Sequence, residues 1–550
     1  MINANMKKTL FLLLFISFLP LVDLLHTGIP RGHDTPDHVA RIANFYQSLS
    51  EGTMIPRWAG NLNWGYGHPI LMFLYPLPSY IASLFHAAGF TFVDSTKLVF
   101  AVSYVASVLA MFLFAKTAWG LVPGITAAVL YGFAPYRFVD LYVRGAIGEH
   151  TAFIFPPLIF YGLLRTARYR RSIWAGVVTP LAMAGLLLSH NAVAVMILPL
   201  IVLFIVYLTA FEAKDRIRFI VSASWYLAIG FLLSVFFWVP AYFEGKYTLR
   251  DIVTKGDMAN RFVPWRWFFL SSWNYGGGEE FTKALGFAQW LAIGATPILF
   301  VRTKERATQW FAAVAVLLLV ASLWLMTDGS AVIWNWVTIM QKFQFPWRFL
   351  TVAVFLSSLM GALTTAHWPK KFRAFFVFCL TTIAVVSTRS MWLAPEYLVK
   401  QDTYYSNIYS GTTDTGESSP VWSVRFMEQR PKSFYEVIEG EAVLVPVRRT
   451  ATRHEFNVLA RTDARIADNT LYFPGWIVAV DGRVLDPVRE LIYQDPSYRG
   501  LMTFRVSPGD HRIVVSFGET KLRNAANLLS AAGLIILIFH VSVLRKLHVL

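Results

Sequence analysis

Cysteine and charged residues are both scarce in this sequence. Among its 550 residues there is one cysteine, Cys379, so neither a disulfide framework nor a cysteine-based zinc site can form within one chain. Only 15% of the residues are charged, whereas soluble globular domains carry about 25%. The sequence also contains no P-loop, no zinc-ligand spacing, no serine nucleophile elbow and no internal repeat. These shortages argue against a soluble enzyme of the P-loop, zinc or serine hydrolase classes, and against a repeat protein.

Long hydrophobic sequence, in contrast, is abundant. Hydrophobic residues make up 56% of the chain. An apolar run of about 20 residues can cross a bilayer as a helix whose backbone groups are all paired internally. Apolar runs lie near residues 9–25, 69–88, 97–116, 120–137, 150–165, 172–189, 192–211, 218–242, 285–301, 307–327, 347–366, 372–390 and 524–544. The chain is therefore predicted to be a polytopic α-helical protein of the cell inner membrane or plasma membrane, with membrane lipids as partners.

The net charge of +16 could indicate a nucleic-acid partner, but the positions of the basic residues argue against one. Lysine and arginine gather in short loops between apolar runs, as at 214–218, 302–306 and 370–373. Such loops stay in the cytoplasm by the positive-inside rule. Both termini are then cytoplasmic, and no nucleic-acid partner is expected. The segments predicted on the extracytoplasmic side are 138–149, His190-Asn191, 243–284, 328–346 and 391–523.

The thirteen apolar runs raise a problem of parity, because an odd number of crossings cannot join two cytoplasmic termini. The run 69–88 contains Pro69, Pro76 and Pro78, which interrupt a helix. We expect this run to be broken or partly re-entrant, which leaves about twelve spans. The alternative is that 120–137 does not cross. The run 9–25 is either a signal peptide or a retained first span, and the missing small-residue cleavage site favours a retained span.

The character of the sequence changes near residue 391. Residues 1–390 are predicted to form the helical membrane domain, with a first outer loop at 26–68 and a large, basic and aromatic outer loop at 243–284. Period-two alternation, as in 471–480 before the Asp481-Gly482 turn, predicts an extracytoplasmic β-rich domain of sandwich type at 391–523. Residues 524–550 would form a final membrane helix and a cytoplasmic tail.

The first outer loop is expected to contain an amphipathic helix. Thr35 fits the N-cap, Pro36 the first helical position, and Gly52 the end of the helix. Apolar side chains recur between them at helical spacing, at Val39, Ile42, Phe45, Tyr46 and Leu49. This pattern favours a helix that lies in the membrane interface.

Two carboxylates of this loop are candidate catalytic residues. Asp34 has no local partner, so it could act as a base, a metal ligand or a hydrogen-bond acceptor, unless it is a loop aspartate with no role. Asp37 is the second candidate, but an ion pair with Arg41, four residues later, would give it a purely structural role. His38 and Arg41 beside them, and Arg57 later in the loop, are candidate substrate-binding residues.

Further polar residues lie at the predicted outer ends of other spans, where charges need partners and are functional candidates. They add to the candidate substrate-binding set Arg144, Glu149, His190, Asn191, Gln344 and Arg348. Arg348 could hold a phosphate by a bidentate contact. Each group also has a structural alternative: an ion pair between Arg144 and Glu149, a polar turn at His190-Asn191, and snorkelling of Arg348 to lipid headgroups.

Several motifs together resemble one family. They are His33-Asp34 with His38 and Arg41, Gly52 with Pro56-Arg57-Trp58, Gly65-Tyr66-Gly67-His68-Pro69, Tyr75-Pro76-Leu77, Arg144 to Glu149, His190-Asn191, Gln344 to Arg348, Pro474-Gly475-Trp476 and Asp481-Gly482. On these residues the chain resembles the large bacterial and archaeal membrane glycosyltransferases of the GT-C superfamily. The group concerned is often labelled 6-pyruvoyl-tetrahydropterin synthase-related membrane proteins. The resemblance covers nearly the whole chain.

The resemblance implies a GT-C-like fold and transfer of a sugar from a polyprenyl-phosphate carrier on the extracytoplasmic face. The acceptor would be a lipid, glycan or protein of the cell envelope. It also implies a central role for an acidic residue of the first outer loop, which maps onto Asp34. No cofactor is predicted, and a divalent metal, although compatible with carboxylate chemistry, is not predicted either.

Two non-enzymatic readings stay open. One is a transporter or flippase of lipid-linked glycans, and the other is a membrane scaffold that displays the β-domain for binding. Transporters place ionisable residues near the bilayer midplane, often in repeated halves. In this chain the charges gather at span ends and no repeat is found, which favours the enzyme.

Overall fold

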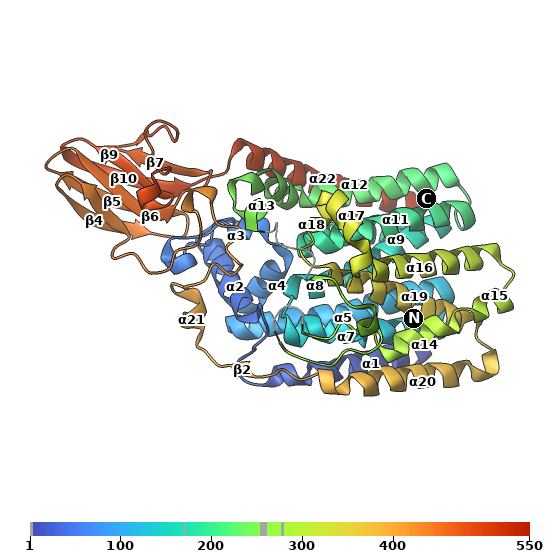
Figure 1. Ribbon diagram of the computed structural model, residues 1–550. Helices are drawn as coiled ribbons and strands as arrows, with labels where there is room; N and C mark the ends of the chain where they lie inside the picture. The colour runs from blue at the N-terminus through green and yellow to red at the C-terminus, as the bar shows by residue number, and fades with distance from the viewer. Residues whose placement is uncertain (1–3, 170–171, 254–260, 277–279, 550) are drawn as a thin grey trace.

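The computed structural model describes residues 4–169, 172–253, 261–276 and 280–549. It consists of a bundle of long helices and a β-domain that stands at one end of that bundle (Figure 1). Helix α1 (Ala4–Phe18) begins, and helix α22 (Lys521–Val549) ends, at the opposite end. Residues 254–260 and 277–279 of the predicted large outer loop lie outside the described residues.

Within the described ranges, nine helical segments are long and apolar enough to cross a membrane. They are Met6–Leu25, Phe92–Trp119, Ile147–Arg168, Asn191–Phe211, Arg216–Tyr247, Arg306–Trp324, Pro346–His367, Lys370–Met391 and Lys521–Lys546. Three shorter apolar segments, Leu121–Gly132, Ile173–Ser189 and Phe287–Arg302, account for the other predicted runs apart from 69–88. The predicted class, a polytopic helical membrane protein with a C-terminal β-rich domain, is confirmed.

Among the described residues, twenty further α-helices lie between α1 and α22 in chain order. They are α2 (Thr35–Ser50), α3 (Ile70–Phe73), α4 (Leu77–Ala87), α5 (Phe92–Trp119), α6 (Leu121–Gly132), α7 (Pro135–Phe138), α8 (Ile147–Ala152), α9 (Phe155–Arg168), α10 (Ile173–Ser189), α11 (Asn191–Phe211), α12 (Arg216–Phe243), α13 (Arg250–Val253), α14 (Phe287–Ala295), α15 (Ile298–Arg302), α16 (Arg306–Trp324), α17 (Ala331–Trp336), α18 (Thr338–Gln341), α19 (Leu350–His367), α20 (Lys370–Thr388) and α21 (Asp402–Ser406).

The proline-rich run 69–88 is broken, as predicted. It forms α3 and α4, and the helix is interrupted at Leu74–Pro76, where Leu74 is extended. The 11 residues of α4 reach about 16 Å at 1.5 Å per residue, roughly half the thickness of a hydrocarbon core. This run therefore supplies no spanning helix of its own.

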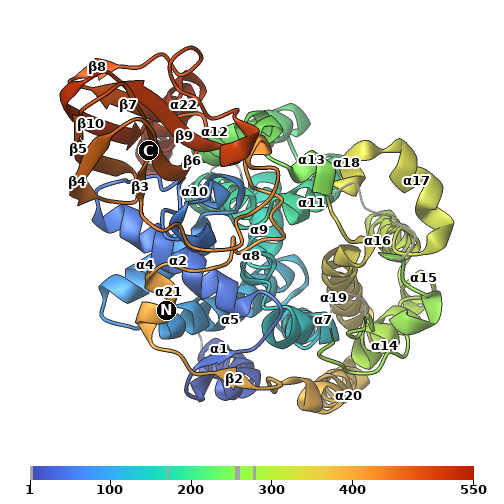
Figure 2. The same cartoon turned by 60° about the vertical axis from the view of Figure 1, so that its left-hand side comes forward.

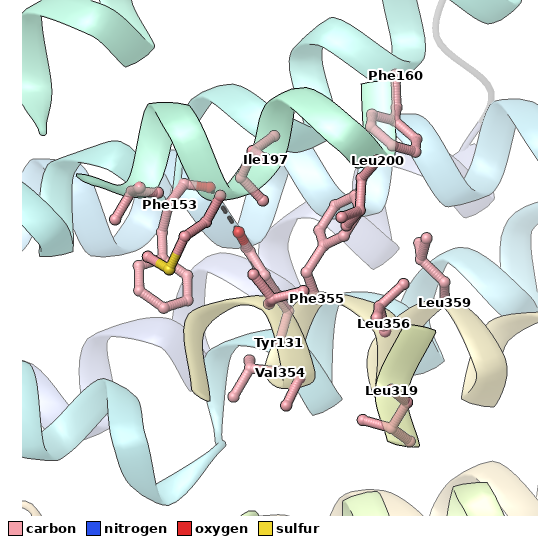
Figure 3. Packing of buried hydrophobic residues seen from close by; sticks show 14 of the residues in the cluster. Tyr131, Phe153, Phe160, Ile197, Leu200, Leu319, Val354, Phe355, Leu356 and Leu359 are labelled. Carbon is pink, nitrogen blue, oxygen red and sulfur yellow. Dashed lines mark hydrogen bonds between the residues drawn. The ribbon is translucent and has the colours of Figure 1, made fainter. Parts of the chain in front are cut away.

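Helix α19 lies in the interior of the bundle. Of an 18-residue apolar stretch within the segment Pro346–His367, which contains it, 94% is buried. Figure 3 shows Phe355 of α19 between residues of α9 and α11, with Leu356 and Leu359 nearby. A polar contact within this apolar region is the 2.8 Å hydrogen bond from the Tyr131 hydroxyl to the carbonyl oxygen of Phe153. The central position of α19 fixes the residues at its N-terminal end relative to the other helices.

Helix α2 packs its apolar side chains against other parts of the protein. It contacts α4, α5 and α21, and Figure 2 shows α2 and α21 side by side across the β-domain end of the bundle. The predicted apolar stripe is therefore present, but its partners are other elements, and Val39, Ile42 and Phe45 are at most 2% exposed. The helix ends as predicted before Gly52, which has a φ of +96°.

The β-domain is a two-sheet structure, as the alternation predicted. Its strands are β3 (Tyr435–Glu439), β4 (Ala442–Arg449), β5 (Arg453–Ala460), β6 (Ala464–Leu471), β7 (Trp476–Val480), β8 (Arg483–Val484), β9 (Leu501–Val506) and β10 (Gly509–Phe517). One antiparallel sheet has the order β4-β5-β10-β7-β8 and the other β3-β6-β9. The Asp481-Gly482 turn has positive φ at both residues, which suits the tight β7–β8 hairpin.

Residues 391–434 form a largely irregular segment, called the linker below, between α20 and the sheets. Its strand β2 (Tyr397–Leu398) pairs antiparallel with β1 (Ile29–Pro30) of the first loop. Further along, Asn63 and Trp64 donate backbone hydrogen bonds to the linker at Gly411 and Tyr409. The linker thus runs over the first loop before it enters the β-domain.

Candidate active site

The N-terminus of α2 packs against the segment before α8. Asp34, rather than Thr35, is the N-cap of α2, and its backbone N–H donates a 2.9 Å hydrogen bond to the carbonyl oxygen of Arg144. The contact needs glycine, because Gly145 has a φ of +65° and a Cβ there would lie 2.0 Å from Oγ1 of Thr35. Two segments whose motifs are far apart in the sequence are thereby brought together.

The two candidate catalytic carboxylates have different surroundings. The Asp34 side chain is exposed and forms no hydrogen bond or ion pair with any residue that the structure describes. Asp37 is half-buried and accepts a 2.9 Å hydrogen bond from the Tyr409 hydroxyl. Burial raises the pKa of Asp37 above its ordinary value, and the charges of Asp34 and Asp414 raise it further. Asp34 is therefore open to a ligand, whereas Asp37 is engaged with the linker.

Arg41 does not form the predicted ion pair with Asp37 in the described part of the chain. It is 7% exposed and turns to the linker, where Nε donates to Oγ1 of Thr413 at 3.3 Å and Nη2 donates to the Thr413 carbonyl oxygen. Its Nη1 donates to Nδ1 of His38 at 2.7 Å. Burial lowers the pKa of His38 well below its ordinary value, and the Arg41 charge lowers it further, so the imidazole is neutral. Arg41 fastens the linker to α2, and His38 contacts the linker only through Arg41.

Glu149, in α8, is the centre of a buried polar network. Its Oε1 accepts hydrogen bonds from the hydroxyls of Tyr136, at 2.7 Å, and Thr351, at 2.6 Å. Its Oε2 accepts one from Nη1 of Arg144 at 2.8 Å, and the same nitrogen lies 2.6 Å from Oδ1 of Asp140. The ion pair between Arg144 and Glu149, the structural alternative that the sequence left open, is therefore present.

Arg348 stands beside this network but is less fully engaged by it. Its Nε lies 3.9 Å from Oε2 of Glu149, and its Nη1 donates to the Phe343 carbonyl oxygen at 2.7 Å. The Nε is buried and has no hydrogen-bond partner among the described residues. Arg144, in contrast, bonds two carboxylates and covers the Trp347 ring at 4.5 Å. Arg348 is therefore less fully neutralised by carboxylates than Arg144.

Tyr75 links the α2 region to the network around Glu149. It lies in the break between α3 and α4, and its ring stacks on His190 at a centroid distance of 5.3 Å. Gly148 makes room for it, because a Cβ there would lie 2.1 Å from the ring. The Tyr75 hydroxyl is within the electrostatic reach of both Asp34 and Arg348. Tyr75 belongs to one of the family motifs, but its sequence context gives no reason to treat it as a site residue.

The linker adds two carboxylates that were not among the residues expected from the sequence. Glu417 accepts a 3.1 Å hydrogen bond from Nε2 of Gln344. Asp414 accepts hydrogen bonds from the N–H groups of Gly416, at 2.9 Å, and Ser418, at 3.0 Å. Their run of Gly, Thr, Ser, Asp and Pro at 411–420 signals a polar loop. Nothing in that signal indicates that the loop returns to α2 and α19.

Two residues of the expected substrate-binding set bind other parts of the fold, and a third is exposed. Arg57 is 4% exposed and bonds Glu519 at 2.9 Å, Asn527 at 2.9 Å and the Phe236 carbonyl at 3.1 Å, so it ties the first loop to α12 and α22. His190 is the N-cap of α11, where its Nδ1 accepts from Val193 N–H at 3.3 Å, as the polar-turn alternative expects. Asn191 follows it with an exposed side chain.

The long apolar helices define a polytopic membrane protein. The contacts described above define a charged site at the β-domain end of its bundle. Elements of the first loop, α8, the start of α19 and the linker supply that site. In the described ranges, no group of three or more His, Cys, Asp or Glu side chains is placed so that it could hold a metal ion.

Comparison with protein-family models finds no match. A curated relative from Lactococcus lactis subsp. cremoris (strain MG1363), named only as an uncharacterized protein, is 26% identical over 251 residues. The matched region is 43% of this chain and 40% of the relative, so the chain spans less than half the length of that relative.

Solved structures show distant likenesses. Arabinofuranosyltransferase AftD from Mycobacteria is 15% identical with a TM-score of 0.46, over 70% of this chain and 27% of that one. The Archaeoglobus fulgidus oligosaccharyltransferase is 14% identical with a TM-score of 0.46, over 75% and 61%. ArnT from Cupriavidus metallidurans bound to undecaprenyl phosphate is 12% identical with a TM-score of 0.31, over 74% and 85%. At these scores and identities, the likenesses assign neither a fold family nor an activity to this chain.

Proposed function

We propose that this protein is a glycosyltransferase of the GT-C type. It would move a sugar from a polyprenyl-phosphate carrier to a lipid, glycan or protein acceptor of the cell envelope, on the extracytoplasmic face. The observation that carries the proposal is the presence, at one end of the bundle, of an exposed carboxylate, Asp34, with no partner among the described residues, and of a cation, Arg348, whose one ion pair among those residues is long, at 3.9 Å from Glu149. The carrier and the acceptor follow from the family resemblance of the sequence motifs.

Asp34 is assigned to the acceptor. In the transfer, the acceptor oxygen bonds to the anomeric carbon of the sugar as the bond from that carbon to the lipid phosphate breaks. The acceptor hydroxyl must lose its proton, and a carboxylate can orient the hydroxyl and accept the proton. Asp34 is exposed and has no partner among the described residues, so a hydroxyl can reach it without breaking a contact of the fold.

Arg348 is assigned to the departing lipid phosphate. A guanidinium offsets the charge that develops on phosphate and donates in a geometry that suits its oxygens. Arg144 is less suited, because Asp140 and Glu149 already neutralise it at 2.6 and 2.8 Å. We assign Arg144 and Glu149 to positioning: they hold the segment before α8, against which α2 packs, and set the place of Arg348.

The experiment uses the purified full chain in detergent with synthetic polyprenyl-phosphate sugars and a cell-envelope extract as the source of acceptors. Released polyprenyl phosphate and glycosylated products are followed by mass spectrometry. Asp34→Asn is the test variant, and Asp510→Asn, an exposed aspartate of the β-domain, is the matched control. We expect Asp34→Asn to lower transfer by about 10²–10⁴-fold, the range for a lost general base, and the control to match the wild type.

Two results would contradict the proposal. Transfer by Asp34→Asn at the wild-type rate would remove Asp34 from the reaction. No release from any donor by the wild-type protein, with acceptors present, would contradict the enzyme class and leave the transport or scaffold readings in its place.

A further inference from the structure

A cavity of about 420 Å³ lies between the first loop, the linker and the β-domain. Its lining includes Gln47 at the C-terminal end of α2, Tyr66 of the first loop, Asn407 of the linker and His454 of β5. Gln47 is 13 residues after Asp34, which at 1.5 Å per residue of helix places it about 20 Å away. The cavity is therefore separate from the site around Asp34, and its volume is in the range of small-molecule pockets, about 300–1,000 Å³.

The walls of this cavity are fixed by contacts between distant segments. Glu51, at the end of α2, accepts a 2.9 Å hydrogen bond from the N–H of Ala451 in the β-domain. Asn61 donates from Nδ2 to Oε1 of Gln47 at 2.9 Å and to the Ser406 carbonyl oxygen at 2.7 Å. The first loop, the linker and the β-domain thus hold the cavity in place without a ligand.

The formally charged side chains among the lining residues are arginines. Among its lining residues are Arg430, Arg449 and His454, and no aspartate or glutamate. Asp468 lies behind Arg449, with its Oδ1 3.5 Å from Nη1, and is 0% exposed. Its Oδ2 also lies 2.7 Å from Nδ1 of His454, so Asp468 offsets Arg449 only in part. Arg430 is exposed and forms no ion pair within the described residues. The Glu51 carboxylate lies behind the wall at Ala451 and is not among the lining residues, so the lining itself keeps an unmatched positive charge that attracts an anion.

The uncharged part of the lining combines aromatic rings with amides. Phe434 lies under the Arg449 guanidinium at 4.2 Å, and Tyr66 and Trp58 form a further apolar wall. The Asn407 side chain is exposed and has no hydrogen bond among the described residues. Amides can both donate to and accept from hydroxyl groups, while aromatic rings offer apolar faces. A sugar ring presents both hydroxyl groups and an apolar face.

We infer that this cavity binds an anionic sugar unit of a glycan, with its carboxylate or phosphate on Arg430 and Arg449 and its ring against the aromatic wall. This is a second ligand site, apart from the site proposed for transfer. A glycan unit held there would lie about 20 Å from Asp34, measured along α2.

The test is a calorimetric titration of the full chain in detergent with defined probes. Trigalacturonic acid and glucose 6-phosphate supply the carboxylate and the phosphate, maltotriose and glucose are their neutral counterparts, and tetraglutamate is an anionic peptide. Arg430→Gln is the test variant. Arg448→Gln is the matched control, because Arg448 is an exposed residue of β4 that does not line the cavity. Asn407→Ala serves as a second, independent test variant.

We expect at least one anionic sugar to bind about tenfold or more tightly than its neutral counterpart, which is the range for a charged hydrogen bond. Arg430→Gln should reduce that preference at least fivefold, Asn407→Ala should weaken binding, and Arg448→Gln should leave it unchanged. No binding of either anionic sugar, equal binding by Arg430→Gln and the wild type, or equal binding of tetraglutamate would overturn the inference. The titration measures binding alone, so its outcome is independent of whether the protein transfers sugars.

Discussion

The backbone N–H of Asp34 donates a 2.9 Å hydrogen bond to the carbonyl oxygen of Arg144, a residue 110 positions later in the chain. This bond joins the start of α2 to the segment that leads into α8 and so places the candidate base next to the network around Glu149. Because the backbone makes the bond, it leaves the Asp34 carboxylate free. The site therefore depends on how closely these two backbone segments approach.

Gly145→Ala should disrupt this approach. Alanine at a φ of +65° is strained, and its Cβ would lie 2.0 Å from Oγ1 of Thr35. We expect a lower melting temperature and a loss of transfer, measured on detergent-purified protein. Gly52→Ala is the matched control, because Gly52 also has a positive φ but no atom lies within 4 Å of its ideal Cβ. Equal effects of both substitutions would show that the close contact is unimportant.

The spans and the β-strands could be predicted from the sequence because their signals are local. An apolar run needs only its own length to be recognised, and the prolines at 69, 76 and 78 mark their break within the run itself. Strand β7 alternates buried and exposed side chains from Trp476 to Val478, and that pattern lies in the sequence too.

The partners of polar side chains could be predicted only where they lie close in sequence. The sequence offers the ion pair between Arg144 and Glu149, which are five residues apart, as one alternative. It does not predict that Thr351, Asp414 and Glu417 lie near this site. Arg41 illustrates the limit: a carboxylate lies four residues before it, yet its guanidinium bonds Thr413, 372 positions away. Such choices depend on which segments the packing brings together, and no local pattern encodes that.

Glu149→Gln should destabilise the protein strongly. Glu149 is 0% exposed and pairs with Arg144 at 2.8 Å and with Arg348 at 3.9 Å. Without it, Asp140 still pairs with Arg144, but Arg348 loses its ion pair, and breaking a buried ion pair costs about 3–5 kcal/mol because a charge is left uncompensated. Thr351→Val is the matched control, since it removes only one hydrogen bond to the same carboxylate, at a cost of about 1–3 kcal/mol. The measurement is the folded fraction after heating, by size-exclusion chromatography. A larger loss in Thr351→Val would contradict the central role given to Glu149.

The ionisation of Asp37 should make the stability of the protein depend on pH. Its pKa is raised, chiefly by burial, so the folded state favours the protonated form more than the unfolded state does. This contribution to stability is fully present below the ordinary Asp pKa of about 3.9 and is lost as the pH rises through the higher folded value. Asp37→Asn mimics the protonated form and keeps an acceptor for the Tyr409 hydroxyl.

We therefore expect Asp37→Asn to stabilise the protein at pH 7 relative to the wild type, and to do so less at pH 4. Melting temperatures of both proteins across this range give the comparison.

Asp414 supplies a case of the opposite sign. Burial alone would raise its pKa, but His68 and the N–H donors of Gly416 and Ser418 outweigh burial and lower the pKa. Stability from Asp414 is present at neutral pH and lost as the pH falls, so Asp414→Asn should cost more at pH 7 than at pH 4. The same pH profile for both variants would refute these assignments.

Arg41→Lys should release the linker from α2. The planar guanidinium bonds both Oγ1 and the carbonyl oxygen of Thr413 and also Nδ1 of His38, and a lysine ammonium cannot reproduce that fork. Hydrogen–deuterium exchange at 411–420 should rise at least about tenfold, and transfer should fall because Asp414 and Glu417 lose their places. Arg31→Gln is the matched control, since Arg31 meets the linker at Glu396 through an exposed ion pair, a kind that contributes about 0–1 kcal/mol. If exchange at 411–420 stays at the wild-type level in Arg41→Lys, the linker is held by other contacts and Arg41 belongs to substrate binding, as the sequence alone suggested.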